Sequence, residues 1–107
     1  MQETINDIFK RNYGVLSKEE QSRLSQAKVT VIGAGGVGGV TLISLARMGF
    51  GHIRVVDMDH FDYSNINRQM LSSVSRVGKS KAECAYETLI DINPNLQVDI
   101  VVEKMVE

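Results

Sequence analysis

The stretch that most restricts the fold is GAGGVG at residues 33–38, which directly follows the apolar run KVTVI at residues 28–32. Its glycines match the pattern G-x-G-x-x-G at the end of a predicted strand and the start of a predicted helix. A glycine turn in this context is typical of a nucleotide-phosphate site, because the helix that follows offers free N–H groups to an anion. The pattern suggests a dinucleotide such as NAD and is also compatible with ATP.

Each glycine of the turn has a predicted task. We expect Gly33 to allow a tight turn, Gly35 to let the backbone approach a phosphate, and Gly38 to let helix and strand pack closely. Gly36 is an additional glycine that we also place at the phosphate.

Apolar runs and helical spacings alternate along the rest of the chain. Two further β-branched runs, HIRVVD and LQVDIVVE, predict strands at residues 52–57 and 96–103. Helices are predicted at residues 17–27, 36–48 and 78–93. This order predicts an α/β fold, a three-layer Rossmann-like doubly wound parallel sheet of which about three strands, the N-terminal half, are present. Short N-terminal helices precede it.

Local signals fix some details of these elements. Ser17 and Glu20 form a capping-box pattern that starts the first helix. The strand at residues 28–33 reads as buried on both faces of the sheet. In the helix after the glycine turn, Val40 and Ile43 are expected to pack on the sheet.

Size and composition suit one compact domain. The chain has 107 residues, of which 43% are hydrophobic and 23% are charged, and its formal net charge is −1. This charge gives no indication of a broad basic face, so nucleic-acid binding is not expected. We divide it into an N-terminal helical segment, 1–27, and a Rossmann-like nucleotide-binding domain, 28–107. The sequence has no apolar run long enough to span a membrane, it has no export signal, and it contains a single cysteine. The expected location is therefore cytoplasmic.

Acidic residues follow the second predicted strand. Asp57 comes 19 residues after Gly38, close to the roughly 20 expected for a residue that binds a ribose hydroxyl. Asp59 lies two positions further on and would point to the same side. We interpret Asp59 as a ribose ligand and Asp62 as an ordinary loop residue.

The loop that follows contains NINRQ at residues 65–69. An arginine near a phosphate site can neutralise charge with a planar fork of donors, which makes Arg68 a candidate. Asn65 and Gln69 could position the loop or the phosphates. Lys79 and Lys81 then begin a helix, where cations oppose the helix dipole unless an anion is bound.

These blocks together resemble a known family. The segments VIGAGGVGG, VVDMDHFDYSNINRQ, VGKSKAE and INPN, in this order and spacing, resemble the adenylation domain of the ThiF/MoeB/HesA family, relatives of ubiquitin-activating enzymes. The resemblance implies an enzyme that uses ATP and magnesium to adenylate the C-terminal carboxylate of a small ubiquitin-like or sulfur-carrier protein. It also implies a homodimer.

The resemblance assigns roles by position. The glycine turn would hold the phosphates, Asp59 the ribose and Asp57 a supporting position. The phosphate site would be lined by Asn65, Arg68, Gln69 and Lys81, with Lys79 at a more variable position. Arg11 resembles an arginine that reaches the ATP of the partner subunit in the family.

Other family parts fall outside this sequence. The resemblance places the magnesium ligand, any zinc-binding cysteines and any catalytic cysteine beyond Glu107, so we expect the chain to be the N-terminal portion of a longer protein. His52 and His60 need no catalytic role, because a carboxylate nucleophile is already ionised at neutral pH. Cys84 is interpreted as a packing residue within a helix.

Three alternatives stay open. A tRNA-modifying dehydratase of the same family would activate a carboxylate on a nucleoside. An NAD(P)- or FAD-dependent oxidoreductase domain would use the same glycine turn. A non-catalytic regulatory subunit would keep the fold and bind a nucleotide or partner.

Overall fold

The computed structural model describes residues 7–103. Along the chain its elements are η1 Lys10–Asn12, α2 Lys18–Gln26, β1 Lys28–Ile32, α3 Gly36–Met48, β2 His52–Val56, η2 Tyr63–Asn65, η3 Val74–Arg76, α4 Lys81–Ile92 and β3 Gln97–Val101. The predicted alternation of strands and helices is confirmed, and each strand is five residues long.

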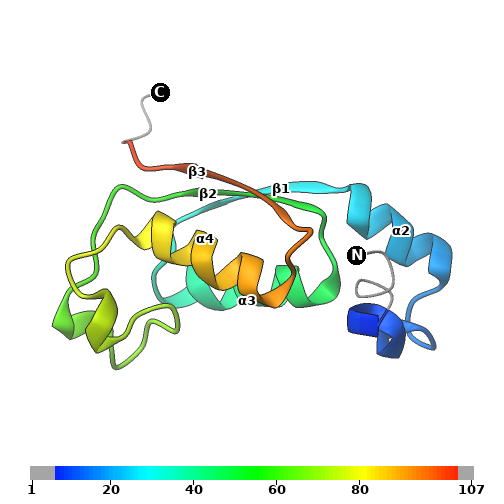
Figure 1. The fold of residues 1–107 in the computed structure, drawn as a ribbon, viewed down its shortest axis with the longest axis horizontal. Helices are drawn as coiled ribbons and strands as arrows, with labels where there is room; N and C mark the ends of the chain where they lie inside the picture. Colours follow the sequence, from blue (N-terminus) through cyan, green and yellow to red (C-terminus); the bar gives the residue numbers. More distant parts are fainter. Residues whose placement is uncertain (1–6, 104–107) are drawn as a thin grey trace.

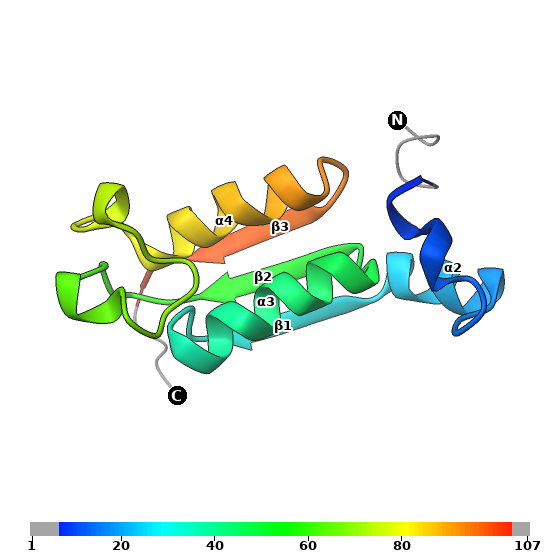
Figure 2. The same cartoon turned by 90° about the horizontal axis from the view of Figure 1, so that it is seen from below.

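The three strands form one parallel sheet in the order β1-β2-β3. Val31 of β1 lies opposite Val55 of β2, which lies opposite Ile100 of β3. Helix α3 connects β1 to β2 and α4 connects β2 to β3, and both lie against the same face of the sheet (Figures 1 and 2). The α/β class and the Rossmann-like arrangement are therefore confirmed.

The core lies between this face and the two helices. Most of its fully buried side chains come from α3, β2 and α4, namely Leu42, Ala46, Ile53, Val55, Ala82, Ala85, Cys84 and Leu89, and loops add Ala34 and Leu71. Burying a Leu or Ile side chain contributes roughly 1.5–3 kcal/mol, so this layer holds the strands in register and fixes where they end.

The opposite face of the sheet is open in the described part of the chain. Burial alternates along β1, and Ile32 is 69% exposed. The prediction that this strand is buried on both faces is therefore wrong for these residues. The physical reason is that both connecting helices pack on one side, which residue patterns within a single strand do not reveal.

Two local predictions have different outcomes. The capping box at the start of α2 is confirmed, since Ser17 Oγ accepts the Glu20 N–H and the Glu20 carboxylate accepts the Ser17 N–H. In α3 the predicted inward residue Val40 is instead 44% exposed, and Leu42 is fully buried. The other predicted inward residue, Ile43, packs against the core and is confirmed. Gly39, which faces Leu71 of a distant loop, is buried at this end of the helix in place of Val40. Among residues 7–103 no helix is long and apolar enough to cross a membrane.

Candidate nucleotide site

The glycine turn lies at the carboxyl end of β1, as the sequence predicts. Gly33 has a φ of 97°, a left-handed conformation that favours glycine. Its N–H donates to the Val56 carbonyl of the neighbouring strand at 2.7 Å. A Cβ on Gly38 would lie 1.9 Å from the Gly33 carbonyl oxygen, so only glycine lets α3 begin this close to the turn.

The first acidic residue ties the turn to β2. Asp57 Oδ2 accepts the Ala34 N–H at 2.7 Å, and Oδ1 accepts the Asp59 N–H at 2.8 Å. Both carboxylate oxygens therefore have backbone partners. Asp59 has an exposed side chain at the same edge of the sheet. Of the two carboxylates, that of Asp59 is therefore the one open to a ligand.

A shallow depression of about 320 Å³ lies over this edge of the sheet. It is bordered by Gly33, Asp57 and Asp59 together with Ile32, Val56, Met58 and Glu103. Ligands of open parallel sheets bind outside the carboxyl ends of the strands. The depression is therefore in the position expected for a nucleoside.

Asn65 organises the loop that carries Arg68. It is 9% exposed, its side-chain oxygen accepts the Asp62 N–H at 2.8 Å, and its carbonyl accepts the N–H of Gln69 at 2.9 Å. The exposed Arg68 side chain folds back on its own loop, where Nη1 donates to the Ser64 carbonyl at 2.9 Å. The loop is thus held by buried amides, and its guanidinium lies on the surface.

The loop packs directly on the glycine turn. The side-chain amide of Gln69, 8% exposed, covers Gly35, while the nearest atom to a Cβ on Gly36 is the Arg68 carbonyl oxygen at 4.0 Å. The sequence motif predicted that these residues lie near a phosphate. The contact itself was not predictable, because it joins segments more than thirty residues apart.

Lys81, at the start of α4, is a lysine with little exposed surface. It is 8% exposed, and its ammonium lies 5.6 Å from the centre of the Phe61 ring. Its N–H donates to the Asp59 carbonyl at 3.0 Å, which places the start of α4 beside the acidic segment. None of the ion pairs formed by the described residues includes Lys81.

Two other basic residues lie elsewhere. Lys79 is exposed and precedes α4, which begins at Lys81 rather than at Gly78. Arg11 is exposed in η1, at the opposite end of the sheet from the glycine turn (Figure 2). Within one chain, the structure therefore gathers the glycine turn, the acidic segment, the Arg68 loop and Lys81, and it leaves Arg11 far from them.

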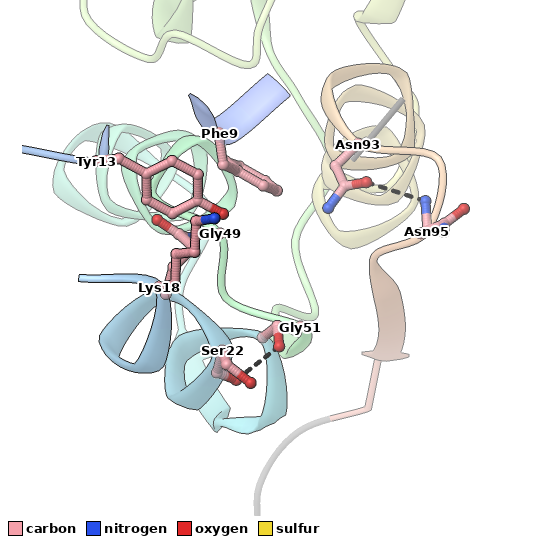
Figure 3. Close-up of a pocket in the computed structure, with 10 residues that line it drawn as sticks. Phe9, Tyr13, Lys18, Ser22, Gly49, Gly51, Asn93 and Asn95 are labelled. Carbon is pink, nitrogen blue, oxygen red and sulfur yellow. Dashed lines mark hydrogen bonds between the residues drawn. The ribbon is translucent and has the colours of Figure 1, made fainter. Parts of the chain in front are cut away.

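A second cavity, of about 350 Å³, lies at the amino ends of the strands. Phe9, Tyr13 and Lys18 line one side, and Asn93 and Asn95 line the other (Figure 3). The Lys18 ammonium lies 5.9 Å from the centre of the Tyr13 ring. No sequence motif indicated this cavity, because its walls come from three separate segments.

Three other residues considered in the sequence, Cys84, His52 and His60, lie outside this group. Cys84 is buried, and burial raises the pKa of its thiol. His52 Nε2 lies 2.6 Å from Asp99 Oδ2 on the open face of the sheet, and His60 is exposed. The part of the chain that the structure describes contains no group of three His, Cys, Asp or Glu side chains that could hold a metal ion.

Comparison with known proteins agrees with this arrangement. The sequence profile of the ThiF family matches residues 9–107. The chain belongs to the ThiF family. It is 47% identical over 83 residues to a protein of Mycobacterium tuberculosis named probable adenylyltransferase/sulfurtransferase MoeZ, an overlap of 78% of this chain and 21% of that protein.

Two tRNA threonylcarbamoyladenosine dehydratases are also similar to the ThiF-family chain. The Bacillus subtilis protein is 40% identical over 90 residues, covering 84% of this chain and 35% of the relative. The solved structure of the Escherichia coli enzyme TcdA in complex with ATP superposes with a TM-score of 0.91 at 32% identity, covering 94% of this chain and 42% of that one. The chain thus spans between a fifth and about two fifths of the length of these relatives.

Proposed function

We propose that this chain is the nucleotide-binding portion of an enzyme that adenylates the C-terminal carboxylate of a small ubiquitin-like or sulfur-carrier protein with ATP. The observation that carries the proposal is Lys81, a lysine that is only 8% exposed and has no ion-pair partner among the described residues, close to the edge where the glycine turn and Asp59 lie. Lysines with so little exposure are normally paired. A phosphate supplies the missing partner.

The positions of the other residues support ATP as the anion. A ribose over the depression at Gly33 would bring its hydroxyls to the free carboxylate of Asp59, and Asp57 would hold the turn. The phosphates would then run toward the N-terminus of α3 and Lys81. This agrees with the name of MoeZ as an adenylyltransferase and with the ATP bound in the similar TcdA structure.

The proposed reaction is an in-line displacement at the α-phosphorus. A carboxylate oxygen of the acceptor forms a bond to phosphorus while the bond to the bridging oxygen breaks, and pyrophosphate leaves. No general base is required, because the carboxylate is ionised at neutral pH. Arg68 and Lys81 stabilise charge on the phosphate oxygens, and Arg68 exchanges its bond to the Ser64 carbonyl for one to phosphate.

Magnesium, when bound, would neutralise charge on the phosphates. Asp57 already uses both oxygens on backbone N–H groups, and residues 7–103 contain no group of three His, Cys, Asp or Glu side chains that could hold a metal ion. We assign magnesium to no residue of this chain, and the proposed displacement is described without it.

The assembly that we propose is a homodimer in the cytoplasm, without a membrane partner. Arg11 is exposed in η1, and this segment lies at the opposite end of the sheet from the start of α3 (Figure 2). In a dimer, Arg11 of the partner subunit would reach the phosphates of the bound ATP.

A second candidate is the dehydratase activity of TcdA. It is favoured by the TM-score of 0.91 to the E. coli enzyme and by the 40% identity to the B. subtilis protein. The two candidates share ATP and activation of a carboxylate, and they differ in the acceptor, which is a protein tail in one and a tRNA nucleoside in the other.

ATP–pyrophosphate exchange with labelled pyrophosphate tests the proposed adenylation. We expect label to enter ATP when a sulfur-carrier protein with a free C-terminal carboxylate is added, and not when the same protein carries a C-terminal amide. The Arg68→Ala variant should lose exchange. Exchange that depends on tRNA and not on the carrier protein would favour the second candidate, and exchange with neither acceptor would contradict the proposed function.

A further inference from the structure

The side chain of Arg76 joins two parts of the candidate site that are not adjacent in the chain. Its Nη1 donates to the Leu71 carbonyl at 2.8 Å and to Thr88 Oγ1, in the middle of α4, also at 2.8 Å. An Nη atom of a guanidinium carries two hydrogens, so each acceptor can receive its own. One nitrogen atom therefore links the loop that carries Arg68 to helix α4.

The Leu71 carbonyl depends on this link. No backbone N–H among residues 7–103 donates to it, and a partly buried carbonyl needs a donor. The Arg76 side chain is 22% exposed, and its Nη2 is 3.9 Å from the Glu87 carboxylate. The guanidinium is thus held mainly by the loop carbonyl and by Thr88, and only weakly by an ion pair.

Hydrogen bonds within the loop connect Leu71 to Arg68. The Gln69 N–H donates to the Asn65 carbonyl at 2.9 Å, and the Ser72 N–H donates to the Gln69 carbonyl at 2.9 Å. The Leu71 side chain itself is 2% exposed. The backbone of Arg68 therefore cannot move far unless the Leu71 carbonyl moves with it.

The exposed side chain of Arg68 has no such support of its own. Its Nη1 donates to the Ser64 carbonyl and to the Asn67 side chain, both in the same loop. These bonds place the guanidinium within the loop, whereas the bonds of Arg76 place the loop against α4, the helix that begins with Lys81. A charged group that is already held in position binds a ligand more tightly and acts more efficiently.

We propose that Arg76 is a positioning residue that places Arg68 for the phosphates of a bound nucleotide. Arg76 acts through the loop backbone and does not touch the ligand. It precedes the block VGKSKAE and belongs to none of the motifs that indicate the family. The proposal rests on the proposed function in one respect, namely that Arg68 contacts phosphate.

Calorimetric titration of ATP into the 107-residue chain tests this role. Arg76→Ala is measured with Arg68 intact and in the Arg68→Ala variant. The control is Arg47→Ala, because Arg47 is exposed in the last turn of α3, away from the glycine turn. We expect Arg76→Ala to raise the dissociation constant about fivefold or more when Arg68 is present, and less than about twofold when it is absent.

A second variant separates the link from the fold. Thr88→Val removes the acceptor on α4 and keeps the size of the side chain. It should weaken ATP binding in the same Arg68-dependent way, and it takes the place of Arg76→Ala if that variant does not melt cooperatively.

Hydrogen exchange of the free chain gives a readout that needs no ligand. In Arg76→Ala, the amides of Gln69 and Ser72 should exchange at least about tenfold faster relative to the amide of Val55, which is buried in β2. A role in overall stability alone would accelerate all three amides by the same factor.

Three results would overturn the proposal. They are an unchanged dissociation constant in Arg76→Ala, an equal increase with and without Arg68, and equal acceleration of exchange at the loop amides and Val55. Failure of the proposed function is distinguishable, because wild type would then not bind ATP. Faster exchange confined to the loop would in that case still support the link made by Arg76.

Discussion

Asp57 Oδ2 accepts the backbone N–H of Ala34 at 2.7 Å, and this hydrogen bond joins the end of β2 to the glycine turn after β1. The other carboxylate oxygen accepts the Asp59 N–H at 2.8 Å. One side chain thus fixes the relative position of the two segments that form the candidate site.

Replacing Asp57 with Asn should destabilise the chain. Asn has one acceptor oxygen, so its NH₂ group would face one of the two N–H donors and that hydrogen bond would be lost. Losing a hydrogen bond to a charged group costs about 1.5–3 kcal/mol. The free energy of unfolding in urea measures this. Asp91→Asn is the matched control, because Asp91 is exposed on α4; equal effects of the two changes would contradict the supporting role of Asp57.

Gly38→Ala should disrupt the start of α3. The new Cβ would lie 1.9 Å from the Gly33 carbonyl oxygen, so the turn and helix must separate, at a cost of about 3 kcal/mol or more in unfolding free energy. Gly36→Ala is the control, since its nearest neighbouring atom is at 4.0 Å and its effect should stay within about 0.5 kcal/mol. Chemical denaturation of the two variants compares them, and similar stabilities would argue against close packing at Gly38.

The pair of His52 and Asp99 should make stability depend on pH in acid. The hydrogen bond from His52 lowers the pKa of Asp99. Since the carboxylate is the stabilised form, the contribution is present above the pKa of about 3.9 that Asp has in an unfolded chain. It is lost as the pH falls through the lower pKa of the folded state.

Melting temperatures of wild type and Asp99→Asn measure this dependence. The difference between them should be largest above about pH 5 and should disappear toward about pH 2. A difference that does not change over this range would show that ionised Asp99 contributes nothing to the pH dependence.

Local sequence signals were sufficient for the elements and for the turn. Gly33 is required by its left-handed φ, and Gly38 is required by its close contact with the Gly33 carbonyl. Ser17 and Glu20 form the capping box of α2. The order of strands and helices follows from such signals, and so does the edge of the sheet at which Asp57 and Asp59 lie.

Long-range contacts limited the rest. In α3 the expectation for Ile43 was confirmed and that for Val40 was wrong, and Gly39, which faces Leu71 of a distant loop, is buried instead. The Gln69 contact with Gly35 and the Phe61 ring near the Lys81 ammonium join segments that are distant in sequence. The functional roles of Arg68, Lys81, Arg11 and Asp59 stay predictions, because they concern a ligand and a partner subunit.

Lys81→Met should separate stability from binding. Methionine keeps the length and apolar stem of lysine and removes a cation from the N-terminal turn of α4. Since a cation there opposes the helix dipole, the free energy of unfolding should rise by about 0.3–1 kcal/mol. Thermal or urea denaturation measures the change, and Lys79→Met, at an exposed residue before the helix, is the control.

Calorimetric titration of ATP into wild type, Lys81→Met and Lys79→Met measures whether the chain binds ATP and whether Lys81 contacts its phosphates. We predict that ATP binds wild type and the Lys79 variant with similar affinity, and that Lys81→Met raises the dissociation constant at least about tenfold, equivalent to about 1.4 kcal/mol. Equal affinity of wild type and Lys81→Met for ATP would contradict the assignment of Lys81 to the phosphates. The absence of ATP binding to wild type would contradict the nucleotide site itself.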